Sequence, residues 1–360
     1  MTSLVRNCVT EMSAYVPGEQ PADLGVVKLN TNENPYPPSP AVLRELKKIS
    51  ADNLRRYPDP ECRILRSAVA RLHRCSSDRI FIGNGSDEIL ALCSRAFLED
   101  NGRIRFFEPS YSLYPVLASI RNAKSCAVSL DGNFAWPGRR RPLPAGSGGL
   151  FYMTNPNAPT GILYPKNEVA RFCRRFKGVV VLDEAYVDFA RANCVNLALQ
   201  LENTLVLRTL SKSYSLAGLR IGYAIGPRKL IDALVKIKDS YNVGRIAQAL
   251  ATAAIGDQAY MRANVRRIIA TRRRLARELA SMGFLVLPSD TNFIFVRPAG
   301  IKAETLYRRL REKNILVRYF ACARTREFLR ITVGTDGQIN MLLKAITSIQ
   351  KAKGKRQEAE

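Results

Sequence analysis

Short apolar runs alternate with amphipathic helical segments through the middle of the chain, and this alternation leaves few possible folds. Val179–Leu182 is too short for a helix and suits a buried strand, whereas Lys166–Phe176 has the periodicity of a helix. Strands and helices that alternate in this way predict a mainly parallel sheet covered by helices on both faces, an α/β fold. In such sheets the ligand lies beyond the carboxyl ends of the strands. The other strands expected here are Ile80–Ile82, Arg103–Phe107, Leu150–Met153, Thr204–Arg208 and Ile221–Ile225, with helices at Ser86–Leu98 and Leu113–Ile120.

The 360 residues are too many for one ordinary core and suit a large and a small domain. The proline-rich segment Asn34–Pro40 is expected to be extended, so residues 1–40 should form an arm that packs on the small domain and the active site. Residues 41–255 should form the large domain and 256–350 a smaller α+β domain, followed by a disordered charged tail at 351–360. The elements expected after residue 225 are helices at Arg228–Ser240, Asp257–Met282, Ala303–Lys313 and Met341–Gln350, and strands at Phe284–Leu287, Phe293–Arg297, Ile315–Val317 and Phe328–Val333.

The chain is strongly basic, with a formal net charge of +25. Such a charge can attract nucleic acid, but the positive residues are spread along the sequence and no aromatic stacking motif is interleaved with them. A solvated basic surface that steers small anionic ligands is the favoured interpretation, with no nucleic-acid partner. No apolar run approaches membrane-spanning length and no export signal is recognised, so the eight scattered cysteines indicate reduced thiols in a cytoplasmic protein. With a single histidine and no paired cysteines, no metal site is expected.

A glycine-rich turn, Gly83–Glu88, follows one predicted strand and opens the next helix. The free N–H groups at a helix N-terminus can hold a phosphate. The third glycine of the dinucleotide fingerprint is replaced by Glu88, and there is no P-loop lysine motif. The turn therefore predicts a phosphate site that does not serve a dinucleotide.

Lys212 lies just past a predicted strand, within the serine-rich stretch Thr209–Gly222. A lysine in this position can be a surface charge, a phosphate ligand or a nucleophile that bonds a carbonyl carbon. Ser211 and Arg220 could hold a phosphate, and Asp183, at the end of another strand, could face a protonated ring nitrogen. Pyridoxal phosphate requires these three features together: a lysine, a carboxylate and a phosphate-binding site.

Segments along nearly the whole chain, about Ala14 to Ile349, carry a family resemblance. The sequence resembles the fold-type-I pyridoxal-phosphate-dependent aminotransferases, in which a large domain with a mainly parallel sheet is followed by a smaller α+β domain, and it is most similar to the histidinol-phosphate aminotransferases. Each segment alone is weak evidence for the family, but the occurrence of all of them in the same order is specific for it. The segments, with Lys212, are Tyr15–Gly18, Leu29–Tyr36, Arg56–Pro58, Gly85–Glu88, Pro109–Tyr114, Pro156–Gly161, Asp183–Tyr186 and Leu329–Gly334.

The resemblance implies a role for each cofactor-binding residue. Lys212 would bond the cofactor covalently and act as the catalytic base and acid, and Asp183 would pair with the ring nitrogen. Tyr186 would hydrogen-bond the ring hydroxyl, and Tyr111 would stack on the ring. Backbone N–H groups of two residues would bind the phosphate together with two side chains, and a tyrosine would reach the neighbouring subunit's phosphate in a homodimer. These five residues are Ser86, Asp87, Ser211, Arg220 and Tyr57.

The resemblance also implies the substrates. Arg318 and Arg330 would bind the anionic groups of histidinol phosphate and of glutamate or 2-oxoglutarate, and Tyr15 would touch the substrate phosphate. The sequence departs from the family at Ala158, where an asparagine usually contacts the ring hydroxyl. Either the preceding Asn157 replaces that asparagine or Tyr186 acts alone.

Three other functions stay open at this stage. An aromatic amino-acid aminotransferase or a threonine-phosphate-type decarboxylase would use the same cofactor and scaffold. A non-enzymatic binder of anions or nucleic acid would retain binding without Lys212, and its binding would weaken steeply with salt.

Overall fold

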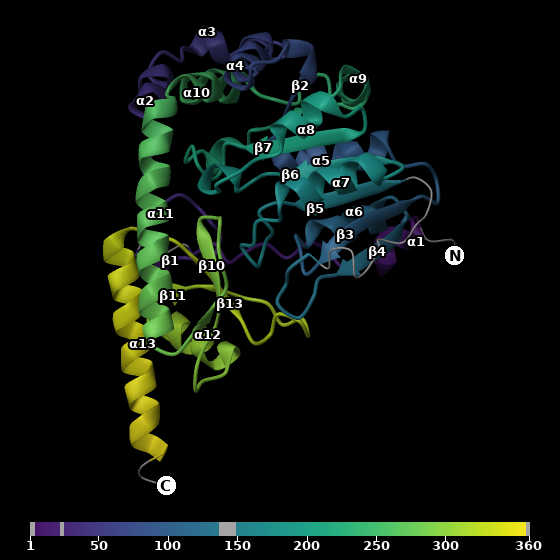
Figure 1. The fold of residues 1–360 in the computed structure, drawn as a ribbon. Helices are drawn as coiled ribbons and strands as arrows, with labels where there is room; N and C mark the ends of the chain where they lie inside the picture. Colours follow the sequence, from purple (N-terminus) through teal and green to yellow (C-terminus); the bar gives the residue numbers. More distant parts are fainter. Residues whose placement is uncertain (1–3, 22–24, 137–148, 358–360) are drawn as a thin grey trace.

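A long helix joins two parts of unequal size, each with its own sheet (Figure 1). This computed structural model describes residues 4–21, 25–136 and 149–357. The larger part holds seven strands, and the smaller part holds an antiparallel sheet and the C-terminal helix. Within the described residues no helix is long and apolar enough to cross a membrane.

The large domain is built on a seven-stranded sheet in which only β8 runs against its neighbours. The remaining neighbours pair in parallel, so the predicted α/β fold with a mainly parallel sheet is confirmed. Because the parallel strands share one direction, their carboxyl ends lie at one edge of the sheet. In spatial order the strands are β2 (Ile80–Gly83), β8 (Gly222–Ile225), β7 (Thr204–Thr209), β6 (Val179–Asp183), β5 (Leu150–Thr154), β3 (Arg103–Glu108) and β4 (Lys124–Ser129).

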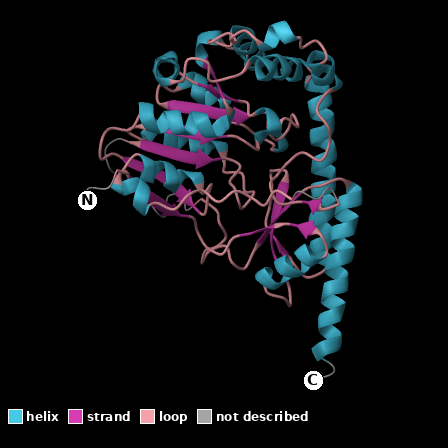
Figure 2. Cartoon of the chain, turned by 180° about the vertical axis from the view of Figure 1, so that it is seen from behind, coloured by secondary structure: helices cyan, strands magenta, loops and turns pink. Residues whose placement is uncertain are grey.

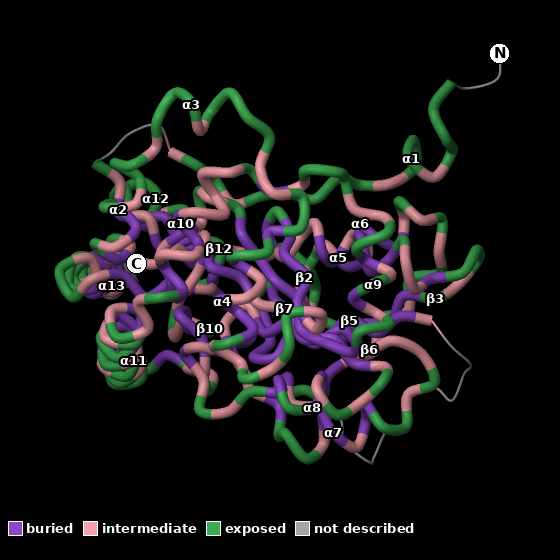
Figure 3. The backbone as a smooth tube through the Cα atoms, turned by 90° about the horizontal axis from the view of Figure 1, so that it is seen from above, coloured by how far each residue is buried: buried purple, intermediate pink, exposed green. Residues whose placement is uncertain are grey.

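Successive residues of the central strands enter different clusters of buried side chains. Val180 and Leu182 belong to one cluster and Val181 to the other, as the two-residue period of a strand requires. Both faces are thus covered, which explains why these strands are continuously apolar (Figure 3). One face packs on α5 (Gly85–Ala96), α6 (Leu113–Ile120) and α9 (Arg228–Ile237); the other packs on α7 (Lys166–Arg175) and α8 (Val195–Gln200), with α4 (Arg63–His73) and α10 (Arg245–Gly256) in the same cluster.

The small domain has a four-stranded antiparallel sheet backed by helices (Figure 2). Helix α11 (Gln258–Ser281) links the domains, because Ile268 joins the large-domain cluster and Leu275 the small-domain cluster. The other elements are β12 (Arg318–Tyr319), β13 (Leu329–Thr332), β10 (Phe293–Arg297), β9 (Leu285–Val286), α12 (Ala303–Glu312) and α13 (Asp336–Gln357).

The N-terminal arm crosses from one domain to the other. After α1 (Asn7–Glu11), strand β1 (Val27–Lys28) pairs in parallel with β11 (Ile315–Leu316) of the small domain. The following segment, Asn30–Asn34, then lies between the domains, since its polar groups contact residues of both. We call this segment the interdomain strap. The arm ends at α2 (Pro40–Leu46), which precedes α3 (Ala51–Leu54), and single turns of 3-10 helix lie at Ser77–Arg79, Val187–Phe189 and Ala217–Leu219.

Several elements differ from the sequence predictions. Pro40 is helical, contrary to expectation, because it occupies the first turn of α2, where its missing N–H is not needed and Ser39 caps the helix. Helix α13 continues to Gln357, into the tail expected to be disordered, since lysine, alanine, glutamine and arginine are good helix formers; residues 358–360 lie outside the described residues. Helices α1, α3, α8 and α10, the short strand β1 and the edge strand β4 were not predicted as elements.

Candidate active site

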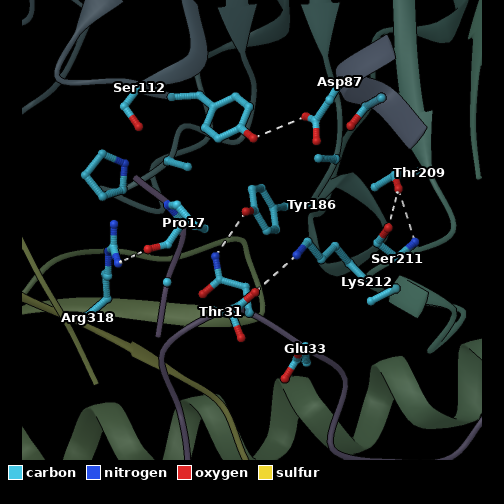
Figure 4. A pocket seen from close by; sticks show the side chains of 18 of the residues that line it. Pro17, Thr31, Glu33, Asp87, Ser112, Tyr186, Thr209, Ser211, Lys212 and Arg318 are labelled. Atoms are coloured by element: carbon cyan, nitrogen blue, oxygen red, sulfur yellow. Dashed lines mark hydrogen bonds between the residues drawn. The ribbon is translucent and has the colours of Figure 1, made fainter. Parts of the chain in front are cut away.

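A pocket of about 460 Å³ lies at the carboxyl edge of the large sheet, closed from the other side by the strap and the small domain. Its lining includes the loops that follow β5, β6 and β7, as well as the start of α5. Figure 4 shows Lys212, Tyr186 and Asp87 extending into the pocket from these elements, and Arg318 of β12 lying on the small-domain side. The volume suits a small-molecule ligand.

Lys212 stands in the loop after β7, three residues beyond the strand's last residue, Thr209. Its Nζ donates to the backbone carbonyl of Thr31 at 3.3 Å and lies 5.9 Å from the ring centroid of Tyr186 (Figure 4). Burial, and then the positive charge of Arg330, lower the pKa of Lys212 to about 8. A sizeable fraction of this amine is therefore neutral near physiological pH, as a nucleophile or proton acceptor must be.

Asp183 is the last residue of β6 and is only 3% exposed. The hydroxyl of Tyr114 donates to one carboxylate oxygen at 3.1 Å, and the backbone N–H of Ala185 donates to the other at 3.1 Å. Burial nevertheless raises the pKa of Asp183 to about 6, although these two hydrogen bonds oppose the rise. The pocket thus contains a carboxylate that a positively charged ring nitrogen would stabilise in its ionised form.

An anion site is formed where α5 begins. The N–H groups of Ser86 and Asp87 lie in the first turn, which has no intrahelical acceptor for them. β8 runs close beside this turn. At Gly222 of β8, a side-chain Cβ would lie only 2.6 Å from the Ser86 backbone nitrogen, so only glycine fits there. The Ser211 hydroxyl lines the same end of the pocket and accepts a hydrogen bond from Thr209 at 2.9 Å (Figure 4).

The side chain of Asp87 connects the anion site to the aromatic wall. One carboxylate oxygen accepts from the Tyr111 hydroxyl at 3.1 Å, and the other pairs with the Arg220 guanidinium at 3.0 Å. Burial raises the pKa of Tyr111, so its hydroxyl stays protonated as a donor. Tyr111 lines the pocket and meets the ring of Tyr15 edge to face at 5.8 Å.

Two arginines line the opposite end. Arg330, on β13, donates to the carbonyl of Asn30 at 3.0 Å, yet its Nε is buried with no hydrogen-bond partner among the described residues. Arg318, on β12 and paired in register with Arg330, donates to the carbonyls of Val16 and Pro17 at 3.0 and 3.1 Å. Burial lowers the pKa of Arg330, and the like charge of Arg318 adds to this effect. A bound anion would satisfy the orphaned donor and relieve the repulsion.

Tyr57 is the one predicted site residue that does not line this pocket. Its side chain is 76% exposed and stacks on Tyr241 with ring centroids 4.4 Å apart. Within this chain it therefore contacts none of the other site residues, and its predicted role requires a second subunit.

Sequence reasoning missed several groups of the site. Thr31, Asn32 and Tyr114 hold predicted residues in place, and they become neighbours only through the fold. The stretch Leu29–Tyr36 carried a signal in its three asparagines, but not their partners. The amide of Asn157 donates to the Pro109 carbonyl, in the loop after β3, and to Thr160 of its own loop, both at 3.0 Å, while Ala158 lines the pocket. Asn157 is fully buried and does not line the pocket, whereas Tyr186 does.

The fold and this combination of lysine, buried carboxylate and two anion sites define a fold-type-I pyridoxal-phosphate-dependent enzyme. Residues 25–346 match the family "Aminotransferase class I and II". The chain is 43% identical to histidinol-phosphate aminotransferase 1 of Nostoc sp., over 98% of this chain and 100% of the relative, and 47% identical to histidinol-phosphate aminotransferase 2 of Thiobacillus denitrificans, over 95% and 96%. The crystal structure of the histidinol-phosphate aminotransferase from Sinorhizobium meliloti in complex with pyridoxal-5'-phosphate superposes with a TM-score of 0.84 at 26% identity, covering 97% of this chain and 99% of that one. This chain therefore belongs to the class I and II aminotransferases and, within them, to the histidinol-phosphate aminotransferases.

Proposed function

We propose that this protein uses pyridoxal phosphate to exchange an amino group between L-histidinol phosphate and 2-oxoglutarate, giving imidazole acetol phosphate and L-glutamate in histidine biosynthesis. The observation that carries the proposal is the similarity to histidinol-phosphate aminotransferases at 43% and 47% identity over nearly the full chain. The pocket supports it, because a lysine of lowered pKa stands there between a buried carboxylate and a pair of arginines.

The chain's own groups fit the cofactor. Lys212 would hold its carbonyl carbon, Asp183 would face its ring nitrogen, and the α5 N-terminus with Ser211 and Arg220 would hold its phosphate. When bound, pyridoxal phosphate supplies an electron sink that stabilises negative charge on the substrate carbon next to nitrogen. An ionised Asp183 would hold the proton on that nitrogen and so maintain the sink.

Lys212 then carries the proton transfers. Its lowered pKa leaves part of the Nζ unprotonated, so this amine would act as a base and then as an acid within the pocket. It would take the proton from the substrate carbon that bears nitrogen and return a proton to the cofactor carbon on the other side of that nitrogen. Thr31 lies within 3.3 Å, where its carbonyl can accept a hydrogen bond from that amine and orient it.

The arginine pair is proposed to bind both substrates. A phosphate on one substrate and a carboxylate on the other suit the same two guanidinium groups, which bind either anion through parallel hydrogen bonds. Arg330 provides the orphaned Nε, and Arg318 is held by the arm that also brings Tyr15 to the pocket. Tyr15 would touch the substrate phosphate.

We also propose a cytoplasmic homodimer. Apolar side chains near the start of the large domain are unusually open, with Leu54 63%, Tyr57 76% and Ile64 74% exposed. A second subunit would cover them and would bring its Tyr57 to the phosphate of the first. All eight cysteines are free thiols, which suits a reducing compartment.

A single-turnover experiment tests the proposed function. The protein is loaded with pyridoxal phosphate, no oxo acid is added, and histidinol phosphate, phenylalanine or threonine phosphate is mixed in separately. Rapid loss of the absorbance of the lysine-bound cofactor with histidinol phosphate alone supports the proposal. Faster loss with phenylalanine would indicate an aromatic amino-acid aminotransferase, and carbon dioxide from threonine phosphate would indicate a decarboxylase. If the loaded protein shows no such absorbance, the enzyme assignment is wrong.

A further inference from the structure

Asn32 of the strap joins Tyr186 to the small domain. Its Nδ2 donates to the Tyr186 hydroxyl oxygen at 3.0 Å, and the residue is 1% exposed. Its backbone has a φ of 55°, a left-handed conformation that asparagine tolerates better than most residues. The carbonyl of Asn32 accepts from the amide of Asn292 at 2.9 Å, so both its side chain and its backbone are fixed.

The orientation of the Asn32 amide follows from its contacts with Thr332. The Thr332 hydroxyl oxygen accepts from the backbone N–H of Asn32 at 3.0 Å, so its own proton is available for donation. That proton goes to Asn32 Oδ1, 3.1 Å away. The oxygen of the amide is therefore committed to Thr332, and only the NH₂ group can face Tyr186.

This arrangement fixes the role of the Tyr186 hydroxyl. Because its oxygen accepts a proton from Asn32, its own proton points elsewhere, and both residues line the pocket. The side chain of Ala158 has no polar group, and the Asn157 amide is engaged by Pro109 and Thr160. We infer that Asn32 is a positioning residue that turns the Tyr186 hydroxyl into a donor to the oxygen on the cofactor ring, an inference that rests on the proposed function.

Other ionisable groups also face Tyr186. Arg330 and Tyr15 belong to the small-domain side and the arm, whereas Asp183, Lys212 and Tyr111 belong to the large domain. Together they set the pH at which the lysine-bound cofactor titrates. A change at residue 32 replaces none of these groups, but its neighbour Thr31 contacts Lys212, so the effect that passes through Tyr186 is isolated by comparing the change with and without the Tyr186 hydroxyl.

The test is a pH titration of the absorbance of the lysine-bound cofactor in the holoenzyme. Asn32→Gly removes the amide while keeping the left-handed backbone accessible. A donor to the ring oxygen withdraws charge from the neighbouring nitrogen, so its weakening should raise the titration midpoint by ~0.5–1 pH unit. Tyr186→Phe should raise it further, and adding Asn32→Gly to Tyr186→Phe should change nothing more, since Asn32 acts through Tyr186.

A matched control is Asn203→Ala, which removes an amide that donates to the carbonyls of Cys173, Phe176 and Gly178 far from the pocket. It should lower the melting temperature and leave the midpoint unchanged. The inference is overturned if Asn32→Gly leaves the midpoint unchanged, or if its full shift persists in the Tyr186→Phe background. Asn32→Asp provides a second variant, because a carboxylate accepts where the amide donates, and it should raise the midpoint at least as far. Absence of the cofactor band in the unaltered protein would instead overturn the proposed function.

Discussion

Replacing Asp183 with asparagine should make the cofactor-free protein more stable while destroying its activity. The amide has the shape of the carboxyl group, can still accept from the Ala185 N–H and can donate to Tyr114, but it carries no charge. The native carboxylate is 3% exposed, and its burial raises the pKa from 3.8 to about 6. In the absence of cofactor, the ionised form of Asp183 is thus a cost to the folded state.

The size and pH dependence of this cost follow from the two pKa values. The folded state binds the proton more tightly than the unfolded chain, so stability falls as pH rises from about 4 to about 6 and stays reduced above that range. A difference of roughly two pH units corresponds to ~3 kcal/mol at about pH 8, and the same relation leaves only ~1 kcal/mol near pH 4.5. Asp183→Asn should therefore gain most of its advantage at neutral and alkaline pH.

Urea unfolding of the two cofactor-free proteins at several pH values measures the difference in their free energies of unfolding. The melting temperatures of the two cofactor-loaded proteins are then compared. The bound ring nitrogen should stabilise the native protein much more than the variant, and turnover should fall by ~100-fold or more because a charge-stabilising partner is lost. Asp188→Asn is the control: Asp188 pairs with Arg208 at 3.3 Å, so its loss should destabilise the protein. The reasoning is refuted if Asp183→Asn destabilises the cofactor-free protein, or if its effect is the same at both ends of the pH range.

Three further outcomes are expected. Because burial lowers the pKa of Lys212 to about 8, the rate at which cofactor-free protein captures pyridoxal phosphate should rise with pH and level off above about 8 in stopped-flow absorbance, while Lys212→Ala should show no turnover. Arg330→Leu should lower kcat/KM for histidinol phosphate and for glutamate by ~10- to 150-fold, the loss of a charge-assisted hydrogen bond, with a smaller effect of Arg330→Lys; equal activity of all three proteins would contradict its role. Arg208→Leu should cost ~3–5 kcal/mol in chemical denaturation, because it leaves the fully buried Glu184 carboxylate without its partner 2.9 Å away.

Much of the fold and the cofactor end of the site could be predicted from local sequence. The strands before Asp183 and Lys212 are apolar and short, so both residues fell at strand ends that a parallel sheet brings to one edge. β4 was missed because it is an edge strand with polar residues and lacks the continuous apolar signal of its neighbours. The local sequence pattern thus identifies central strands, which are buried on both faces, and misses strands at the edge of the sheet.

The supporting contacts could not be predicted, because each joins residues distant in sequence. Asn32 meets Tyr186 across 154 positions and Thr332 across 300. The orientation of the Asn157 amide, which donates to Pro109 and Thr160, is likewise specified by no sequence pattern. Hydrogen-bond direction in a site is a property of the assembled fold.

The strap also has a consequence for how the protein is made. Val27 and Asn32 leave the ribosome early, yet their partners are Ile315 and Thr332, near the other end of the chain. The large domain has all seven of its strands long before these partners are synthesised, since domains generally fold as units and N-terminal parts first. The arm must therefore wait through most of translation without its neighbours. Because the last strands hold the strap in place, the Thr31 carbonyl can be fixed beside Lys212 only after they have been made, so the site cannot be complete before the chain nearly is.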